Sequence, residues 1–234
     1  MKGMEIESVS DIAKKFYEKL RNLKKYKLTS EKSELPSNLP NWGIGIMYEK
    51  DENAFGFEKI TYISYNKNIG NFGKRLEEHF VMRNKSNRRS SLRNHVARAL
   101  IAKNSDDTRL FDLWNGNREI RKEKTSILKA GNPKYVKDKL EEYENFVDEY
   151  LQEKFSFSII SVQKRIDQQR LRSRIIATLA QAKEIPISKN WLGNFSIDGE
   201  SSLISNNGIW NIECSKGEIL CEDDFILLDE CLKY

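Results

Sequence analysis

Residues that bind transition metals are scarce in this sequence of 234 residues. It holds two histidines and three cysteines, with no HExxH motif and no paired CxxC spacing. A zinc hydrolase, a structural zinc site and a disulfide scaffold are therefore all disfavoured. We expect any bound metal to be a hard cation held by oxygen ligands.

Long apolar runs are missing as well. No run of about 18 apolar residues is present, and residues 1–27 contain no apolar stretch of the signal-peptide kind. With 38% hydrophobic and 32% charged residues, the chain is expected to fold as a soluble protein of one large or two small domains. We expect it to lie in the cytoplasm and not to associate with membranes.

The sequence does have a local excess of positive charge. The net charge is only +5, but residues 83–93 include five basic side chains and no acid, and a second basic cluster occupies residues 164–174. Such an excess is typical of surfaces that bind nucleic acid, the alternative being a solvated loop without a specific partner. The candidate nucleic-acid-binding residues are Lys74, Arg83, Lys85, Arg88, Arg89, Arg93 and Arg98.

Hydrophobic periodicity predicts an α+β fold. The patterns predict a hairpin of two strands, at residues 43–49 and 59–65, and a third strand at residues 155–162. A first helix is predicted over residues 11–27 with Ser10 as its cap. Further helices are predicted over residues 72–82, from Ser90 or Ser91, from Pro133 to about Glu153, after a cap at Asp167, and over residues 223–231.

These elements predict a small mixed or antiparallel sheet of about three strands, flanked by helices and carrying helical additions. We predict an N-terminal helix and linker at residues 1–34. The main domain is predicted at residues 35–234, with a helical insertion at residues 104–154 and a C-terminal extension.

One helix carries residues suited to phosphate chemistry. In the segment KRLEEHF, Arg75 and His79 are four residues apart and so share a helical face, while Leu76 and Phe80 form an apolar stripe. An arginine matches phosphate geometry, and an imidazole can transfer a proton near neutral pH. The alternative is a surface helix whose basic residues pair with neighbouring glutamates and contribute little.

The ordered motifs GIG, YIS and RLEEH resemble those of the GIY-YIG nuclease superfamily. The segments SSLRNHVARALI, IIATLAQ, WLGNFS and NGIWN are similar to a bacterial and archaeal branch related to type II restriction enzymes, and the resemblance covers roughly residues 35–232. It implies a DNA endonuclease that uses one divalent cation, Mg²⁺ or Mn²⁺. Tyr62 matches the family's second tyrosine, Arg75 its arginine and His79 the histidine one turn later, while Asn211 matches a polar residue near the site more loosely.

The resemblance implies in-line attack of water on a phosphodiester. His79 or a tyrosinate would act as general base, Arg75 would stabilise charge on the phosphate, and the metal would hold the leaving oxygen. Two departures from the family stand out. The position of the first tyrosine is taken by Gly45, or by Met47 if the strand is shifted, and Tyr48 or Tyr65 is a candidate to replace it.

The second departure concerns the metal. Arg172 or Ser173 stands where the family carries its metal-binding glutamate, and an arginine repels a cation. The metal ligands are therefore unknown, and Glu184, Glu200 and Glu213 are all open as sources of a carboxylate.

Two functions remain open. The first is a metal-dependent endonuclease of restriction or defence type that cuts double-stranded DNA, as a homodimer if its target is symmetric. The second is a catalytically impaired nuclease fold that binds DNA without cutting it, with Arg172 as a fixed positive charge in place of the cation.

Overall fold

The structure is a computed structural model that describes residues 7–29, 35–80, 90–104, 114, 133–196 and 202–233. In the described residues, the chain forms seven α-helices, three strands and one short 3-10 helix. Their bounds are α1 (Val9–Leu20), β1 (Trp42–Ala54), β2 (Phe57–Tyr65), α2 (Phe72–Phe80), α3 (Ser91–Asn104), α6 (Pro133–Lys154), β3 (Phe155–Val162), α7 (Arg165–Gln181), η2 (Leu192–Phe195), α8 (Ser202–Asn207) and α9 (Glu222–Cys231).

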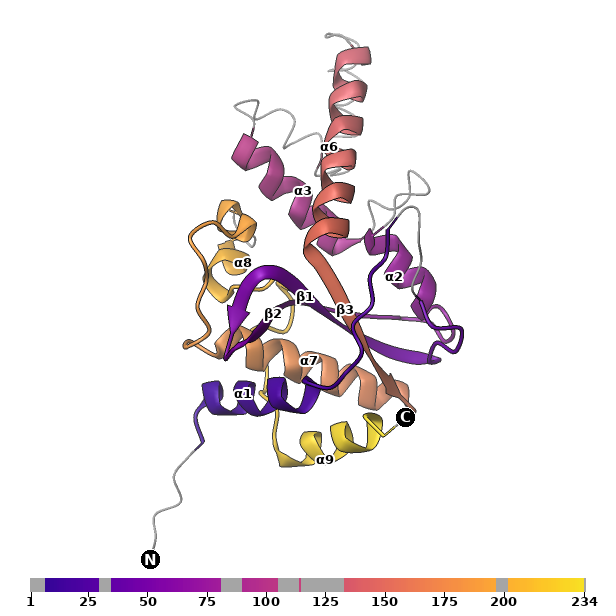
Figure 1. The fold of residues 1–234 in the computed structure, drawn as a ribbon, viewed down its shortest axis with the longest axis vertical. Coiled ribbons are helices and arrows are strands. Elements are labelled where there is room, and N and C mark those ends of the chain that lie inside the picture. The colour runs from indigo at the N-terminus through magenta and orange to yellow at the C-terminus, as the bar shows by residue number, and fades with distance from the viewer. Residues whose placement is uncertain are drawn as a thin grey trace, which may run out of the picture.

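The three strands form one antiparallel sheet in the order β2-β1-β3 (Figure 1). β1 and β2 are joined by a two-residue turn in which Phe55 has φ 54° and Gly56 has φ 84°. Positive φ at both central residues is what a tight hairpin turn needs to match the twist of its strands. The predicted three-stranded α+β fold is confirmed, and the hairpin strands extend further toward the turn than predicted.

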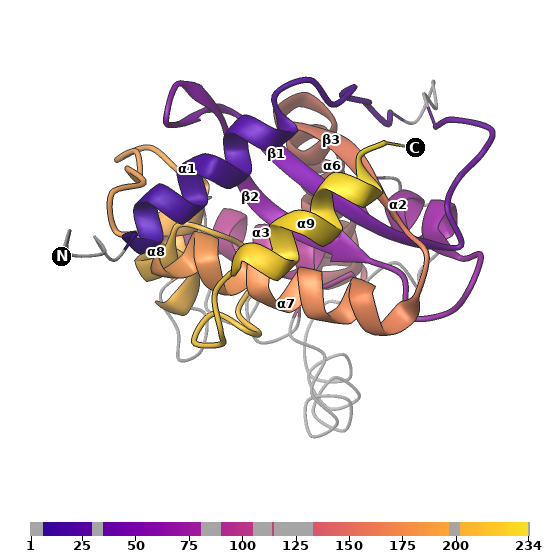
Figure 2. The ribbon, with the colours of Figure 1, turned by 90° about the horizontal axis from the view of Figure 1, so that it is seen from below.

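Helices cover both faces of the sheet. Figure 1 and Figure 2 show α1, α7 and α9 against one face and α2, α3 and α6 against the other. The two faces of β1 match these layers because successive side chains alternate. Ile44 and Ile46 join the core beneath α1 and α7, whereas Met47 joins the core beneath α2 and α3.

Two predicted helix starts were wrong. α1 begins after Ser8, whose hydroxyl accepts a hydrogen bond from the backbone N–H of Asp11 at 3.1 Å, so the cap is not Ser10. The side chain of Asp11 completes the reciprocal pattern of a capping box, which fixes this start. α7 begins at Arg165 after Lys164, and Asp167 lies within its first turn rather than before it.

α1 also ends earlier than predicted, at Leu20. Beyond it, the backbone of Tyr26 exchanges two hydrogen bonds with Phe157 of β3, at 2.8 and 3.0 Å. This bridge requires an extended chain, so the helical pattern cannot continue to residue 27. The helix nevertheless shares one core with β1 and α7. The predicted boundary at residue 34 stays a prediction, as does that of the insertion at 104–154.

Candidate active site

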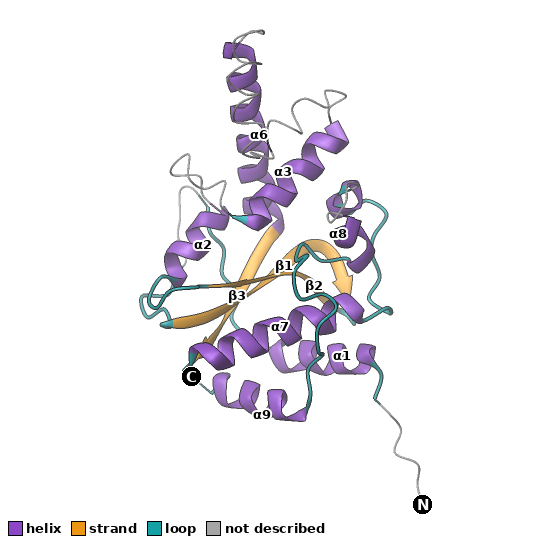
Figure 3. Ribbon diagram, turned by 180° about the vertical axis from the view of Figure 1, so that it is seen from behind, coloured by secondary structure: helices purple, strands orange, loops and turns teal. Residues whose placement is uncertain are grey.

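The free edge of β2 is covered by the chain that follows α8. The side-chain amide of Asn211 donates to the carbonyl of Ile63 at 3.2 Å, and its oxygen accepts from the N–H of Ile63 at 2.8 Å. The N–H of Trp210 donates to the carbonyl of Thr61 at 2.6 Å. Asn211 is therefore used to satisfy the strand edge. The same contacts bring residues 213 and 214 beside Arg172 and Ser173 in the middle of α7, as the view from behind in Figure 3 helps to follow.

Tyr62 points from β2 toward α2 and α3. Its hydroxyl lies 2.7 Å from the Ser91 hydroxyl at the start of α3, and its ring meets the His79 ring edge-on at 5.3 Å between centroids. Burial raises the pKa of Tyr62, while the positive charges of Arg75 and Arg172 oppose the shift. The phenol therefore stays protonated near neutral pH and is a hydrogen-bond donor rather than a base.

His79 is fully buried between two serines. Its Nε2 lies 2.7 Å from the Ser64 hydroxyl and its Nδ1 lies 2.6 Å from the Ser90 hydroxyl. Burial, together with the nearby charges of Arg75 and Arg93, lowers the pKa of His79 well below its ordinary value of 6.5. The ring is neutral, so one nitrogen donates and the other accepts. Because both nitrogens are occupied and no ring atom meets solvent, a proton reaches His79 only through a serine hydroxyl.

Arg75 is the accessible cation of this group. Its side chain is 22% exposed and forms an ion pair with Glu78 of the same helix at 3.2 Å. Its charge acts on both Tyr62 and His79, because it shifts the pKa of each. The structure thus brings Tyr62 and His79 into contact, and Arg75 lies one helical turn before His79 on α2. An anion that approaches Tyr62 comes within the field of Arg75.

Arg172 lies on the α7 side of the same strand end. Its guanidinium stacks over the Tyr65 ring at 4.1 Å and forms an ion pair with Glu213. The Tyr65 ring is half-buried, and it holds the Arg172 guanidinium through this cation–π contact. The neighbouring Ser173 hydroxyl accepts from the Cys214 thiol at 3.6 Å.

A protein-family model for the GIY-YIG domain matches residues 7–222 of the chain. This chain belongs to the GIY-YIG domain family. Membership suggests a nuclease that acts on nucleic acid. Neither the curated proteins nor the solved structures contain a match. None of the described helices is long and apolar enough to cross a membrane.

GIY-YIG nucleases generally use a divalent metal, but the donor set found here does not fit one. No group of three potential ligands from histidine, cysteine, aspartate and glutamate occurs in the described part of the chain. Of the two residues that the resemblance offers for the family glutamate, Arg172 places a positive charge and Ser173 brings no carboxylate, and Glu213 beside them is already paired with Arg172. A single paired carboxylate is a poor cage for Mg²⁺.

The resemblance offers two positions for the family's first tyrosine, Gly45 and Met47, and neither carries a tyrosine. Gly45 faces α2, and a Cβ there would lie 3.3 Å from Leu76 and 3.6 Å from Phe72, so a tyrosine has no room. Tyr48 does not replace it, because its ring belongs to the core on the opposite face of the sheet. Burial raises the pKa of Tyr48 to about 12.

The predicted nucleic-acid-binding residues have different fates. Lys74 is exposed on α2 and remains a candidate, and Arg98 is half-buried on α3. Arg93 was predicted to bind phosphate, but its side chain is 1% exposed and forms ion pairs with Glu144 and Asp148 of α6. It joins α3 to α6 and is out of reach of DNA. The candidates that lie outside the described residues are Arg83, Lys85, Arg88 and Arg89.

The second basic cluster is largely neutralised within the fold. Arg170 and Arg174 both pair with the buried Asp224 at the start of α9, and Arg174 also pairs with Glu218. These pairs attach α9 to α7. The cluster at residues 164–174 is therefore a weaker indication of a polyanion partner than its charge count implied.

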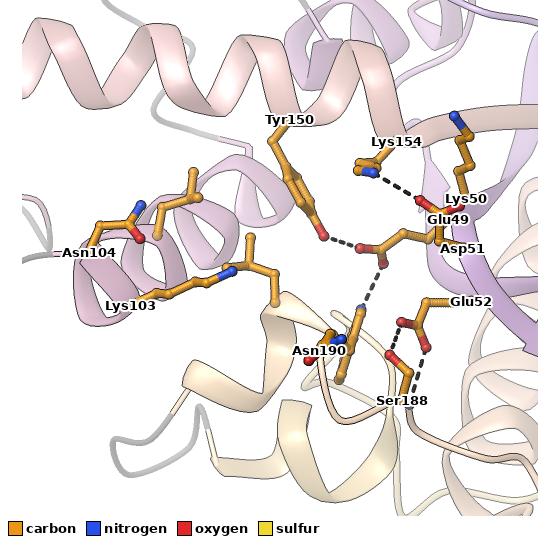
Figure 4. Close-up of a pocket in the computed structure, with 13 residues that line it drawn as sticks. Glu49, Lys50, Asp51, Glu52, Lys103, Asn104, Tyr150, Lys154, Ser188 and Asn190 are labelled. Carbon is orange, nitrogen blue, oxygen red and sulfur yellow. Dashed lines mark hydrogen bonds and ion pairs between the residues drawn. The ribbon is translucent and has the colours of Figure 1, made fainter.

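A pocket of about 530 Å³ opens at the far end of β1, between α3, α6 and the segment before η2 (Figure 4). Three carboxylates line it, and each is already engaged. The buried Glu49 accepts from Tyr150 and, at 2.9 Å, from the indole N–H of Trp191. Asp51 pairs with Lys154 at 2.9 Å, and Glu52 accepts from Ser188. These interactions brace the hairpin against α6 and η2.

Sequence reasoning missed the hydroxyls that surround the site. Ser64 replaces the glycine of the YIG motif, and that replacement was a signal that the position had acquired a polar contact. Ser90 and Ser91 were considered only as helix caps, yet one bonds His79 and the other bonds Tyr62. Glu213 was only one of several acids considered, since its partner Arg172 lies 41 residues away in sequence.

Proposed function

We propose that this chain is an endonuclease of restriction or defence type that hydrolyses phosphodiester bonds of double-stranded DNA. The observation that carries the proposal is the convergence of Tyr62, Arg75 and His79 at the edge of the sheet, in a chain of the GIY-YIG family. A fixed cation, a phenol and a buried imidazole within one cluster are the groups that phosphoryl transfer to water needs.

Each residue has a distinct role in this proposal. Arg75 binds the non-bridging oxygens of the phosphate and stabilises the charge that develops there. Tyr62, whose phenol stays protonated, donates its proton to the oxygen that leaves as the P–O bond breaks. His79 accepts the proton of that water through the hydroxyl of Ser64 or Ser90, because its own nitrogens contact those two hydroxyls.

The divalent cation expected from the resemblance has no role assigned in this mechanism. The described residues near Tyr62 offer Glu213, already paired with Arg172, where a cation needs several oxygen ligands. The mechanism therefore rests on the protein's own side chains. A homodimer acting on a symmetric target remains part of the proposal.

A second candidate is a protein that binds DNA without cutting it. The observation that favours it is Arg172, a fixed positive charge at the position where the family carries its metal-binding glutamate. An arginine holds a phosphate oxygen but does not activate a leaving group as a metal ion does.

Nicking of supercoiled plasmid at low salt separates the two candidates. Wild-type protein is compared with Arg75→Ala and with Arg21→Ala, an exposed arginine at the end of α1 in the opposite helical layer. Each protein is assayed with Mg²⁺, with Mn²⁺ and with chelator. Nicking by wild type and Arg21→Ala that disappears in Arg75→Ala supports the endonuclease. Retention of DNA in a gel shift without nicking in any condition supports the binding protein.

A further inference from the structure

We infer that Arg172 is a built-in substitute for the catalytic cation, so that this site binds a phosphodiester without metal, and that the phosphodiester displaces Glu213 from Arg172. The inference rests on the proposed function to the extent that the edge of β2 is taken as the phosphodiester site. It goes further by naming how the site holds its ligand.

The first observation is the unequal burial of the ion pair. The side chain of Arg172 is 7% exposed, whereas that of Glu213 is 56% exposed. A buried cation needs a counter-charge, but a half-exposed carboxylate loses little when it returns to water. The pair therefore consists of a fixed cation and a carboxylate that can be exchanged for another anion.

The second observation is that Arg172 has donors to spare. In the described structure its Nε is buried and has no hydrogen-bond acceptor. One terminal nitrogen bonds Glu213, and the other lies 3.9 Å from the Cys214 sulfur, which is a weak acceptor. The Tyr65 ring fixes the plane of the guanidinium. A pre-oriented fork with one weakly engaged terminal nitrogen and an exchangeable carboxylate partner is suited to binding phosphate in two-point contacts.

Arg93 shows what a structural arginine looks like in the same protein. Its Nε also lacks an acceptor, but its terminal nitrogens bond two carboxylates, Glu144 at 2.9 Å and Asp148, and the carbonyl of His79 at 3.3 Å. The Glu144 side chain is only 4% exposed and cannot leave without stranding a buried charge. Both terminal nitrogens of Arg93 thus bond strong oxygen acceptors, whereas only one terminal nitrogen of Arg172 does.

The third observation is that the charges of Arg75 and Arg172 both act on Tyr62. The charges of Arg75 on α2 and Arg172 on α7 both favour the ionised form of Tyr62, and Glu213 opposes it. Arg75 lies on the α2 side of β2 and Arg172 on the α7 side, so the two charges flank this edge of the sheet. A phosphodiester placed there receives two positive charges from the protein, which is the charge that a divalent metal supplies elsewhere.

The test is the binding of a short fluorescein-labelled DNA duplex, followed by anisotropy in chelator and again in Mg²⁺. The proteins are wild type, Arg172→Met, Glu213→Gln and the control Arg170→Met. Arg170 lies on the same helix but pairs with Asp224, outside the site. Thermal unfolding of each variant establishes that it is folded. If Arg172→Met does not fold, Glu213→Gln still tests the inference. Residue 213 is exposed, so we expect this variant to fold.

We expect wild type to bind in chelator at least as tightly as in Mg²⁺, because added Mg²⁺ competes for the DNA phosphates. Arg172→Met should weaken binding about tenfold, as expected for a lost charged hydrogen bond, and Arg170→Met should leave it unchanged. Glu213→Gln should tighten binding severalfold, because the competing carboxylate is gone. Plasmid nicking by the same proteins reports on the proposed function separately.

Four results would overturn the inference. Binding that requires Mg²⁺ shows that the charge comes from a metal. Equal affinity of Arg172→Met and Arg170→Met shows that Arg172 does not touch the ligand, and weaker binding by Glu213→Gln shows that Glu213 positions Arg172 instead of competing. Nicking that needs Mg²⁺ and survives Arg172→Met contradicts the inference alone and leaves the endonuclease standing.

Discussion

The β1–β2 hairpin contacts two clusters of buried charge that are built in opposite ways. At one end, Glu49 accepts hydrogen bonds from Tyr150, Trp191 and Trp210, so its carboxylate is fully occupied by the protein. At the other end, one terminal nitrogen of Arg172 has only the weak acceptor Cys214, and the carboxylate that pairs with Arg172 is half-exposed. The comparison teaches that burial alone does not mark a functional charge. What marks it is hydrogen-bonding capacity that the protein leaves free.

The difference follows from what each cluster joins. The Glu49 carboxylate connects β1 to α6 through Tyr150 and to the segments around η2 through the two indoles. Burial raises the pKa of Glu49, and its donors oppose that shift. Arg172, by contrast, lies where α7 meets the covered edge of β2, beside Tyr65 and within the field that acts on Tyr62.

The largest effect should come from disrupting the hydrogen bonds around the buried Glu49. Glu49→Gln keeps the shape of the side chain but brings an amide donor toward groups that are themselves donors. We expect a loss of about 3 kcal/mol in the free energy of unfolding, the cost of unsatisfied buried polar groups. Urea denaturation measures it. DNA affinity of the folded variant should match wild type, and a large loss of affinity at unchanged stability would contradict the division of roles.

Arg75→Ala tests the positive charge at the edge of β2. We expect nicking to fall about a hundredfold or more, the usual effect of removing one charge that stabilises a transition state. The midpoint of unfolding should hardly change, because the pair with Glu78 is partly exposed and such pairs contribute little. Rates and melting curves of the same preparation check both statements. A variant that nicks like wild type would remove Arg75 from the site.

Arg172→Glu tests whether the position beside Glu213 can be converted to a metal site. It places a second carboxylate next to Glu213, without the positive charge that repels a cation. Calorimetry with Mn²⁺ should give a binding heat for the variant and none for wild type. A binding heat for wild type that Arg172→Glu does not increase would contradict the assignment.

The smallest effect concerns pH. Burial lowers the pKa of His79 well below 6.5, and it lowers the pKa of His95 to about 4. The unfolded chain therefore binds protons below about pH 6.5 that the folded chain does not bind, and the fold loses stability as the pH falls. Each histidine contributes about 1.4 kcal/mol per pH unit in this range. Urea denaturation between about pH 6.5 and 5 should show a shallower dependence in His79→Gln, and an unchanged slope would show that His79 takes up a proton in the fold.

Much of the architecture was predictable, because it depends on short-range patterns. The segments GIGIMYE and KITYISY predicted two strands, and Asn132-Pro133 predicted the start of α6. The spacing of Arg75 and His79 was enough to place both on one helix. The choice of Ser10 as the cap of α1 was an error that the sequence itself could have prevented. Ser8 has Asp11 three residues later, which is the spacing that completes a capping box.

The environment of the site was not predictable, because it depends on contacts between residues far apart in sequence. The charge of Arg93 suggested DNA binding, and only its proximity to Glu144 and Asp148 on α6 shows that it is structural. The burial of His79 likewise follows from the two serines that flank it in space, Ser64 and Ser90. A sequence records charge, but whether that charge is free depends on the fold.

The salt dependence of DNA binding in chelator tests the central claim most directly. Each phosphate contact contributes about 0.9 to the slope of log affinity against log salt concentration. If Arg75 and Arg172 hold phosphate groups, Arg75→Ala and Arg172→Met should each reduce the slope by about one contact, and Arg170→Met should not change it. Slopes equal to wild type in both site variants would contradict the account, because the charges at the edge of β2 would then not be the ones that DNA meets.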